Sequence, residues 1–192
     1  MPRAGLSADA VVDIAVELID AGETPLSLTA VAERAGVRTP SLYKHIASLA
    51  DLDALVAARV LAEFSAALDA AIGETTGVEA ARAALGGYRD YARAHPRRFE
   101  ILPVQPGNDP RLAPTSRAML ERIGRAIGAE DPFDPRAIHA MRLLRSCAEG
   151  WTRLESAGGF GEPVDVDESW RVLVDTIAPV IVAELHRDEQ SG

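Results

Sequence analysis

Apolar residues recur at helical spacing along nearly the whole of this 192-residue chain. Near the start, for example, Val11, Ile14, Leu18 and Ile19 fall on one face of a helix expected over residues 7–21. Steps of three and four residues place side chains on one helical face, whereas a half-buried strand needs strict alternation of apolar and polar residues. No sustained alternation runs through the sequence. The chain is therefore predicted to be all-α.

Capping and helix-breaking residues divide the chain into segments. Ser48 and Asp51, for example, form an S-x-x-D start signal for a long helix that ends before Gly73. Pro179 is expected to kink or divide the last helix, because proline lacks the backbone N–H that helix interiors use. The expected helices cover about residues 7–21, 28–34, 40–46, 48–72, 76–94, 96–104, a segment ending near 128, 135–157 and 165–186.

Charge and hydrophobicity limit the class of protein. With 47% hydrophobic residues, the composition is that of a folded globular protein. No run approaches the roughly 18 consecutive apolar residues of a membrane span. The first twenty residues carry acids through their apolar stretch, unlike a secretory signal, so we expect a cytoplasmic protein without a membrane partner. A formal net charge of -9 disfavours broad attachment to nucleic acid, so any DNA contact must be local.

The residues needed for catalysis or metal binding are scattered or absent. Cys147 is the single cysteine and therefore forms no internal disulfide and no cysteine-based zinc site. The four histidines fall in separate segments, and the sequence lacks paired metal-binding motifs, a glycine-rich phosphate loop and a G-x-S-x-G motif. We expect no enzyme activity, no catalytic residue, no cofactor and no metal.

A basic island stands out from this acidic chain, because no acidic residue occurs from Arg34 to Ala50. Residues 28–46 have the layout of a helix-turn-helix, with two short amphipathic helices joined by a turn at Gly36. Glycine there supplies the left-handed conformation that ends the first helix, and Ala32 is small where the helices must approach closely. The residues spaced to fill the core beneath the pair are Val31, Val37, Leu42 and Ile46.

The second short helix leaves hydrogen-bonding side chains facing outward. Such groups bind DNA phosphates and base edges, and the tyrosine adds a flat apolar surface. The predicted DNA contacts are Arg38, Thr39, Ser41, Tyr43, Lys44 and His45. The alternative for these residues is an ordinary solvated face, and Arg34 fits either a DNA-facing or a plain surface position.

The stretch LTAVAERAGVRTPSLYKHIASLADLDAL and the preceding helix resemble the DNA-binding segment of tetracycline-repressor-type (TetR) regulators over about residues 7–64. The Ala-Gly-Val turn, the Leu-Tyr pair, the following histidine and Ser48 are in register. The resemblance implies a homodimer that binds a palindromic DNA operator, most often as a repressor, and is released by a small-molecule effector. It implies an N-terminal DNA-binding domain, residues 1–48, and a C-terminal regulatory and dimerisation domain, residues 49–192.

One position departs from the family pattern. Leu49 stands where such regulators usually carry a lysine that meets a DNA phosphate. The backbone amides at the start of the long helix are the expected substitute, because helix N-termini attract phosphate. The same departure is the only hint of an alternative function, a helical ligand- or protein-binding module that has lost specific DNA binding.

The C-terminal stretch CAEGWTRLESAGGFG resembles the end of the penultimate helix in one subgroup of these regulators. The resemblance implies an effector pocket on the C-terminal helices, and a mostly apolar lining suits a small hydrophobic effector. The predicted lining is Tyr88, Tyr91, Phe99, Met119, Met141, Arg145, Cys147 and Trp151, with His139 as a further polar candidate. Ordinary core packing is the alternative for each of the apolar members.

Dimerisation is expected through the last two long helices, about residues 135–157 and 167–186, which would pair with their mates as a four-helix bundle. The predicted interface residues are Leu144, Leu154, Trp170, Leu173, Ile177 and Ile181. Apolar stripes at this spacing also occur as internal core, which is the alternative for these positions.

Overall fold

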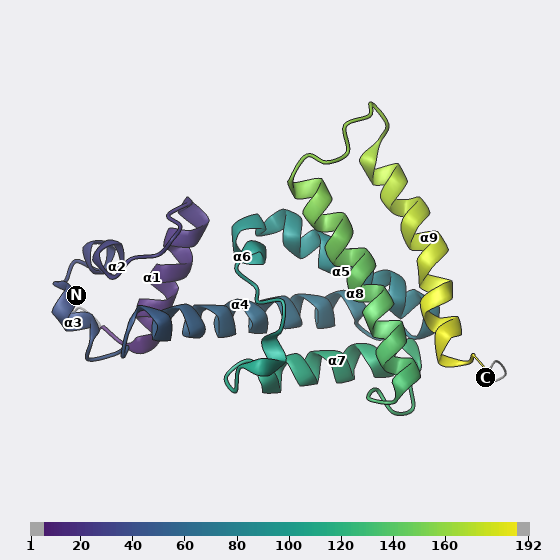
Figure 1. Ribbon diagram of the computed structural model, residues 1–192, viewed down its shortest axis with the longest axis horizontal. Coiled ribbons are helices and arrows are strands. Elements are labelled where there is room, and N and C mark those ends of the chain that lie inside the picture. Colours follow the sequence, from purple (N-terminus) through teal and green to yellow (C-terminus); the bar gives the residue numbers. More distant parts are fainter. Residues whose placement is uncertain (1–5, 188–192) are drawn as a thin grey trace. The chain divides into compact units, whose positions relative to one another are not determined.

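The structure is a computed structural model that describes residues 6–187 (Figure 1). Every regular element in this range is helical, so the predicted all-α fold is confirmed. The elements are α1 (Ala8–Ala21), α2 (Leu28–Ala35), α3 (Thr39–Leu42), α4 (Leu49–Ile72), α5 (Gly77–Ala94), α6 (Pro96–Glu100), the 3-10 turn η1 (Pro106–Asn108), α7 (Ala113–Ile127), α8 (Pro135–Ser156) and α9 (Val166–Leu185).

Two compact units make up the chain, and each is assembled from separate segments. The first unit joins the residues up to Glu63 with His95–Pro114. The second joins Phe64–Ala94 with the residues from Thr115 onwards. Helix α4 is shared between the two units. The division into residues 1–48 and 49–192 stays a prediction about functional domains.

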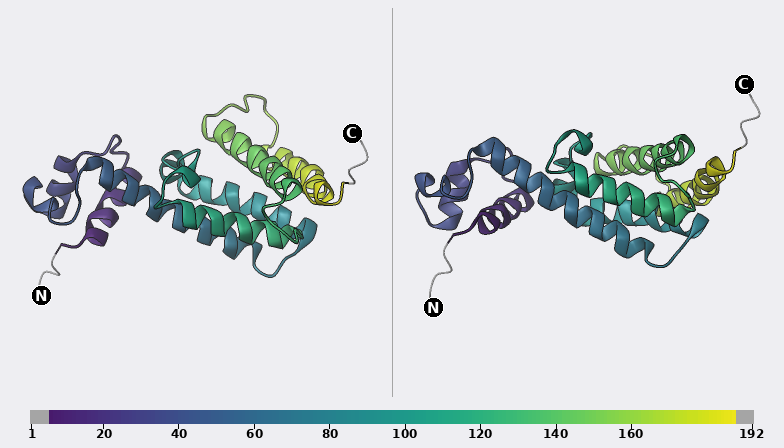
Figure 2. Two further views of the ribbon diagram at one scale, coloured as in Figure 1. Left: turned by 60° about the horizontal axis from the view of Figure 1, so that its bottom comes forward. Right: turned by 90° about the horizontal axis from the view of Figure 1, so that it is seen from below.

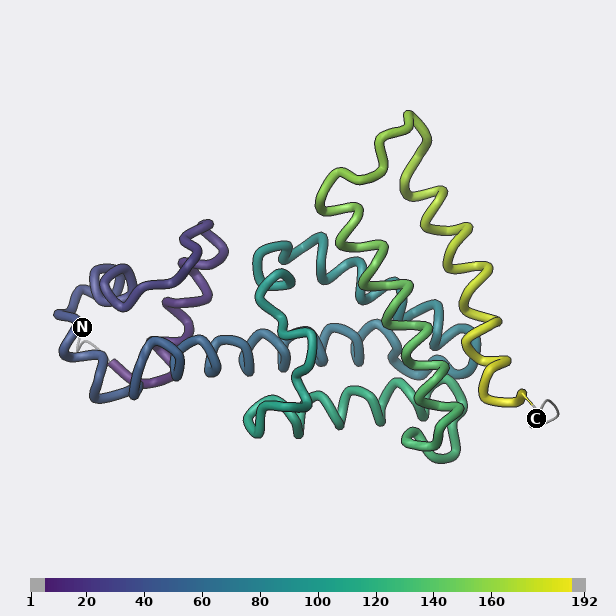
Figure 3. The backbone as a smooth tube through the Cα atoms, viewed as in Figure 1, coloured from purple at the N-terminus to yellow at the C-terminus, as the bar shows by residue number. Residues whose placement is uncertain are grey.

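The first unit holds α1, α2 and α3 around a common apolar core. Figure 3 shows the backbone of these three helices at the purple end of the tube. Ser7 and Ser27 cap α1 and α2, each accepting a hydrogen bond of 3.1 Å from a backbone N–H in the first turn. Gly22 ends α1 in the left-handed region at φ 93°, as the sequence predicts. These caps fix the residues at which α1 begins and ends and at which α2 begins. They therefore also fix which side chains of the two helices face the shared core.

Helix α6 belongs to the first unit and is tied to it by ion pairs. The guanidinium of Arg98 pairs with the carboxylate of Asp20 at 2.5 Å and with that of Glu63 at 2.8 Å. Hydrogen bonding to Arg98 lowers the pKa of Asp20, despite the opposing effect of burial. The side chain of Arg98 is largely buried, so this double pairing keeps its charge compensated.

In the second unit, α5, α8 and α9 pack against one another, as the ribbons of Figure 2 show. An ion cluster around a buried arginine joins all three. Arg89 of α5 is only 4% exposed, and its Nη2 donates to Glu155 of α8 at 2.5 Å and to Asp167 of α9 at 2.7 Å. The guanidinium also lies 5.2 Å from the ring centroid of Trp170. This cluster lowers the pKa of Glu155, mainly through its hydrogen bond to Arg89.

Helix α9 runs without interruption through Pro179, which is exposed. Pro179 therefore does not divide the last helix, and the alternative of a kink stays a prediction. The cost of a proline in a helix interior is its missing N–H and the clash with the preceding turn. On an exposed face, the helix can adjust to both without disturbing the core.

Helices α4 and α5 approach closely at Gly87, and this contact gives a stability prediction. A Cβ at Gly87 would lie 2.6 Å from the Cβ of Ala71, which is closer than two carbon atoms tolerate. Gly87→Ala should lower the free energy of unfolding by about 1–3 kcal/mol, the usual cost of overpacking. Urea unfolding followed by circular dichroism measures this.

The neighbouring Gly86 is the matched control, since a Cβ there meets nothing within 4 Å. Gly86→Ala should raise stability by roughly 0.5–1 kcal/mol, because alanine has the higher helix propensity. Equal effects of the two substitutions would contradict the close approach at Gly87.

Candidate nucleic-acid interface

The second helix of the helix-turn-helix is shorter than predicted. The expected helix over residues 40–46 is α3, Thr39–Leu42, followed by a turn. The backbone keeps a helical course in this turn, because the N–H groups of His45 and Ile46 both donate to the carbonyl oxygen of Leu42, at 2.8 and 3.1 Å. Of the predicted contact residues, Arg38 is therefore the N-cap of α3, Thr39 and Ser41 lie on α3, and Tyr43, Lys44 and His45 lie on the turn after it.

The turn between α2 and α3 forms as the sequence predicts. Gly36 has φ 67°, in the left-handed region, and the N–H of Val37 donates to the carbonyl oxygen of Ala32 at 3.0 Å. Ala32 is buried where α2 packs against its neighbours. The four predicted core residues meet in one apolar cluster, Val31, Leu42 and Ile46 being buried and Val37 partly buried against them.

Burial of Leu42 and Ile46 leaves the polar side chains of this element on its outer side. Tyr43 is 56% exposed, which is high for an aromatic residue, and Arg38 and Lys44 are also exposed. The half-buried members of the predicted set are Thr39, Ser41 and His45. The element thus presents two cations, a phenol and hydroxyl groups from a backbone that the core holds in place.

Two backbone amides at the start of α4 are capped by side chains of the same segment, and phosphate binding by the amides there stays a prediction. The Oγ of Ser48 accepts from the N–H of Asp51 at 3.0 Å, and the Oδ2 of Asp51 accepts from the N–H of Ala47 at 2.8 Å. These two amides are therefore already used within the chain. Leu49, the first residue of α4, is half-buried.

Two arginines near the interface are held by carboxylates. Arg34 pairs with Glu17 of α1 at 3.0 Å, and both side chains are more than half exposed. Arg111 pairs with Asp51 at 2.7 Å across 60 positions of sequence. The position of Arg111 is not predictable from sequence alone, because no local pattern links a residue before α7 to the first turn of α4.

Some of the predicted effector-pocket residues lie together in the second unit. In the second unit, Tyr88 and Tyr91 pack on Phe64, with ring centroids 4.9 and 5.1 Å apart. The hydroxyl of Tyr88 lies 3.4 Å from Glu149, which pairs with Arg145 at 3.1 Å. The pKa of Tyr88 is raised mainly because the phenol is buried, and the negative charge of Glu149 raises it further. The structure therefore connects three of the predicted residues, Tyr88, Tyr91 and Arg145, within one part of the second unit.

The surroundings of the other predicted pocket residues differ from one to the next. Trp151 packs in a separate aromatic cluster, 4.5 Å from Phe160 and 5.3 Å from Trp170 between ring centroids. Phe99 is buried in α6 and belongs to the first unit. The remaining members are Met141, which is buried, and Met119 and Cys147, which are half-buried, while His139 is exposed.

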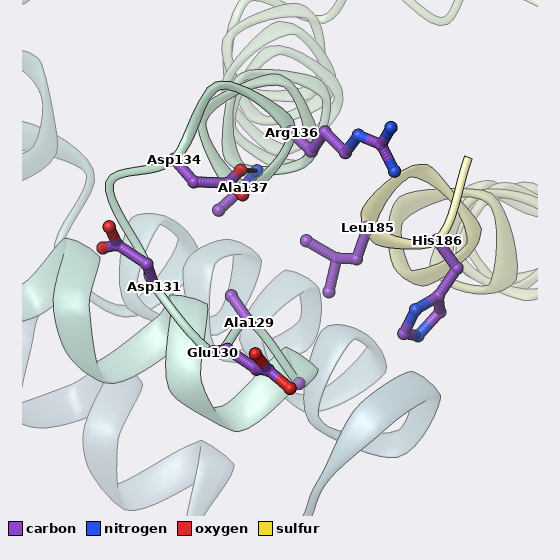
Figure 4. Close-up of a pocket in the computed structure, with 9 residues that line it drawn as sticks. Ala129, Glu130, Asp131, Asp134, Arg136, Ala137, Leu185 and His186 are labelled. Carbon is purple, nitrogen blue, oxygen red and sulfur yellow. Dashed lines mark hydrogen bonds between the residues drawn. The ribbon is translucent and has the colours of Figure 1, made fainter. Parts of the chain in front are cut away.

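Two hollows lie on the second unit. Figure 4 shows the smaller, about 190 Å³, where the connection between α7 and α8 faces the end of α9, with Asp131, Asp134 and His186 on its walls. The larger, about 320 Å³, lies at the connection between α8 and α9 and is lined by Trp151 and Phe160 among others. Within residues 6–187, no group of three metal-ligating side chains is close enough to hold an ion.

The predicted dimer residues divide by burial within the single chain. Leu144, Trp170 and Ile181 are buried in the core of the second unit. Leu173 and Ile177 are half-buried, and Leu154 is 53% exposed. The exposed apolar face of α9 lies on the other side of the helix from Trp170 and Ile181, at Val172, Pro179, Val180 and Ala183. This face is not predictable from sequence alone, because apolar residues occur on both sides of α9.

Two short helices joined by a turn at Gly36, with exposed cations and a phenol at the two ends of the second helix, define a DNA-binding protein of the helix-turn-helix class. Comparison with known proteins agrees. The family model described as tetracyclin repressor-like, C-terminal domain, matches residues 81–177. The uncharacterized HTH-type transcriptional regulator YobS of Bacillus subtilis is 31% identical over 178 residues, which cover 91% of this chain and 92% of YobS. The chain belongs to the TetR family of transcriptional regulators, and it is a regulator rather than an enzyme.

Another relative in sequence and two solved structures of similar fold agree with this family. An uncharacterized HTH-type transcriptional regulator of Mycobacterium tuberculosis is 28% identical over 91% of this chain and 81% of its own length. The solved structure of SCO7222, a TetR from Streptomyces coelicolor, has a TM-score of 0.66 at 24% identity, over 95% of this chain and 100% of that one. A Rhodococcus protein of unknown function has a TM-score of 0.73 at 24% identity, over 93% and 97% of the two chains. Among the described residues, none of the helices has the length and hydrophobicity of a bilayer-crossing segment.

Proposed function

We propose that this regulator is a repressor that binds a palindromic DNA operator as a homodimer, and that a small hydrophobic effector releases it. The observation that carries the DNA-binding part is the exposure of Arg38, Tyr43 and Lys44 on an element whose opposite side is anchored in the core by Leu42 and Ile46. We also propose that Thr39, Ser41 and His45 contact the DNA, and that the protein acts in the cytoplasm.

Electrostatics restrict the binding surface. The formal net charge is -9, so most of the protein surface repels DNA. The stretch from Arg34 to Ala50 has no acid and is the local exception. A two-fold dimer would place two such stretches about 34–36 Å apart, in successive major grooves. Binding should therefore be confined to two half-sites and weaken steeply with salt.

The proposed dimer interface uses α8 and α9. Its support is the exposed apolar face of α9, where Val172 is 62% and Val180 is 45% exposed. Leu154 of α8 adds a third large apolar side chain, 53% exposed. Half-buried Leu173 and Ile177 would be covered further, whereas Leu144, Trp170 and Ile181 would support the interface from within.

A double substitution tests this interface. Val172→Asp with Val180→Asp should give a monomer in sedimentation velocity and should weaken operator binding, because carboxylates would be buried without partners. Val164→Asp is the matched control, since Val164 is 63% exposed but lies outside α9. The control should remain a dimer. A monomeric wild type would contradict the homodimer.

The proposed effector site is the region of Tyr88, Tyr91 and Arg145. Its support is twofold. The ring of Tyr88 packs on Phe64, and the Tyr88 hydroxyl donates to Glu149, which in turn pairs with Arg145. An apolar ligand with one polar end fits such surroundings. The other predicted pocket members, Phe99, Met119, Met141, Cys147 and Trp151, stay predictions.

Selection of DNA tests the proposed function as a whole. The wild-type protein is incubated with a random-sequence duplex library, and a gel shift is run with the DNA flanking its own coding region. We expect recovery of one pseudo-palindromic sequence, and competition by that sequence at concentrations where scrambled duplex does not compete. Failure to recover or shift any duplex would favour the alternative, a helical ligand- or protein-binding module without specific DNA binding.

A further inference from the structure

Asp51, in the first turn of α4, is the first acidic residue after the acid-free stretch that begins at Arg34. Asp51 is held in place, since its carboxylate accepts from the N–H of Ala47 and its own N–H donates to Ser48. Two hydrogen bonds lower the pKa of Asp51. The larger effect comes from the backbone N–H of Ala47 and the smaller from the side chain of Arg111. At neutral pH a fixed carboxylate therefore borders the stretch proposed to bind DNA, where it would repel a phosphate.

Arg111 compensates this charge from a distant part of the sequence. Its Nη2 lies 2.7 Å from the Oδ1 of Asp51, and its Nη1 lies 3.4 Å from the Asp51 carbonyl oxygen. The backbone that carries Arg111 is also fixed, because its N–H donates to Asp109 at 2.7 Å and the next residue, Leu112, is buried. Both residues of the pair belong to the first unit.

The Arg111–Asp51 pair leaves its cation accessible to a further anion. The side chain of Arg111 is 45% exposed, whereas that of Asp51 is 20% exposed, so the cation is the more accessible partner. A guanidinium carries five N–H donors, and the two contacts with Asp51 use only some of them. An exposed ion pair of this kind adds only about 0–1 kcal/mol to stability, so stability alone gives little reason for it.

We infer that Arg111 belongs to the DNA-binding surface and donates to a backbone phosphate beside the first turn of α4. The inference rests on the proposed function and names a further residue of that interface. In this arrangement Asp51 orients the guanidinium, and the phosphate completes its hydrogen bonding. Arginine suits this role because its planar fork can bind a carboxylate and a phosphate at the same time. The cation is supplied by the loop before α7 rather than by α4 itself, where Leu49 carries no charge.

The test is a double-mutant cycle on the duplex that wild-type protein recovers from the random library. R111Q is made in the wild-type chain and in a D51N chain, and operator affinity is measured at several salt concentrations. We expect R111Q to weaken binding at least about tenfold in both backgrounds, the effect of removing a charge-assisted hydrogen bond. The slope of log K against log salt should become less steep by about 1.8 for the dimer, or roughly 0.9 for each phosphate that is no longer neutralised.

R125Q is the matched control, because Arg125 forms a comparable exposed pair with Glu121 at 3.1 Å within α7. It should leave both affinity and salt slope at the wild-type values. Two results would overturn the inference while leaving the proposed function intact. One is an R111Q protein with wild-type affinity and slope, and the other is an R111Q effect that disappears in the D51N chain, which would mean that Arg111 only neutralises Asp51. Failure of the wild-type protein to select any duplex would overturn the proposed function and this inference together.

Discussion

Operator binding is expected to be lost when Tyr43 is replaced by alanine. Tyr43 is the most exposed aromatic residue of the helix-turn-helix, and its removal takes no atom from the core. A DNA contact of this kind is worth about 1–3 kcal/mol, and a dimer loses it twice, so affinity should fall at least about thirtyfold. Footprinting should show no protected operator at concentrations that protect it fully with wild-type protein.

The Tyr43→Ala protein should keep its helical circular dichroism and its unfolding midpoint. Tyr43→Phe is the matched variant, because it keeps the ring and removes only the hydroxyl. We expect it to bind more weakly than wild type but better than the alanine variant. Wild-type operator affinity in Tyr43→Ala would refute the assignment of α3 and its following turn to the DNA interface.

The largest loss of stability is expected from Arg89→Met. This change removes the cation that Glu155 and Asp167 share. Glu155, whose side chain is only 17% exposed, then lacks its main ion-pair partner. Breaking a buried ion pair typically costs about 3–5 kcal/mol. Because Asp167 is exposed and Arg93 remains nearby, we expect about 2–4 kcal/mol, measured by urea unfolding at neutral pH.

Arg93→Gln is the control on the same helix. Arg93 pairs with Asp167 at 3.0 Å, but both side chains are more than half exposed, so the loss should stay below about 1 kcal/mol. Equal losses in the two variants would contradict the importance of burial.

The Arg89 cluster also sets a pH dependence. The pKa of Glu155 is lowered in the folded protein, so its contribution is present above the unfolded value, near 4.3, and is lost as the pH falls through the folded one. The wild type should therefore lose more stability than Arg89→Met between about pH 5 and pH 3. Parallel loss in both proteins would contradict this coupling.

Local signals explain how much of the fold the sequence predicted. A serine cap or a left-handed glycine acts within one helical turn, so Ser7, Gly22, Gly36 and Ser48 placed the helix boundaries from sequence alone. The exposure of Tyr43 was predictable in the same way, because Leu42 and Ile46 fix the inward side of the element. The early end of α3 was not, since the choice between three- and four-residue hydrogen bonding after Leu42 depends on small differences in backbone geometry.

Other features depend on contacts that are distant in sequence. The pairing of Arg111 with Asp51 follows from the fold rather than from any local pattern. The buried side of α9 was ambiguous because apolar residues lie on both sides, and packing against α5 and α8 selects Trp170 and Ile181 over Val172 and Val180. Hydrophobic periodicity predicts that a helix has an apolar face, but it cannot choose between two such faces.

The chain passes between its two compact units at residues 63–64, 94–95 and 114–115. A DNA-reading module cut out as a contiguous N-terminal cassette would therefore lack residues 95–114, and with them the arginines that neutralise Asp20 and Asp51. Chimaeric regulators built by exchanging N-terminal segments at residue 63 would carry Asp20 and Asp51 without the parent's arginines, and an exchange at residue 48 would separate Asp20 from Arg98. A transplant that also carries residues 95–114 from the same parent would keep those charges matched.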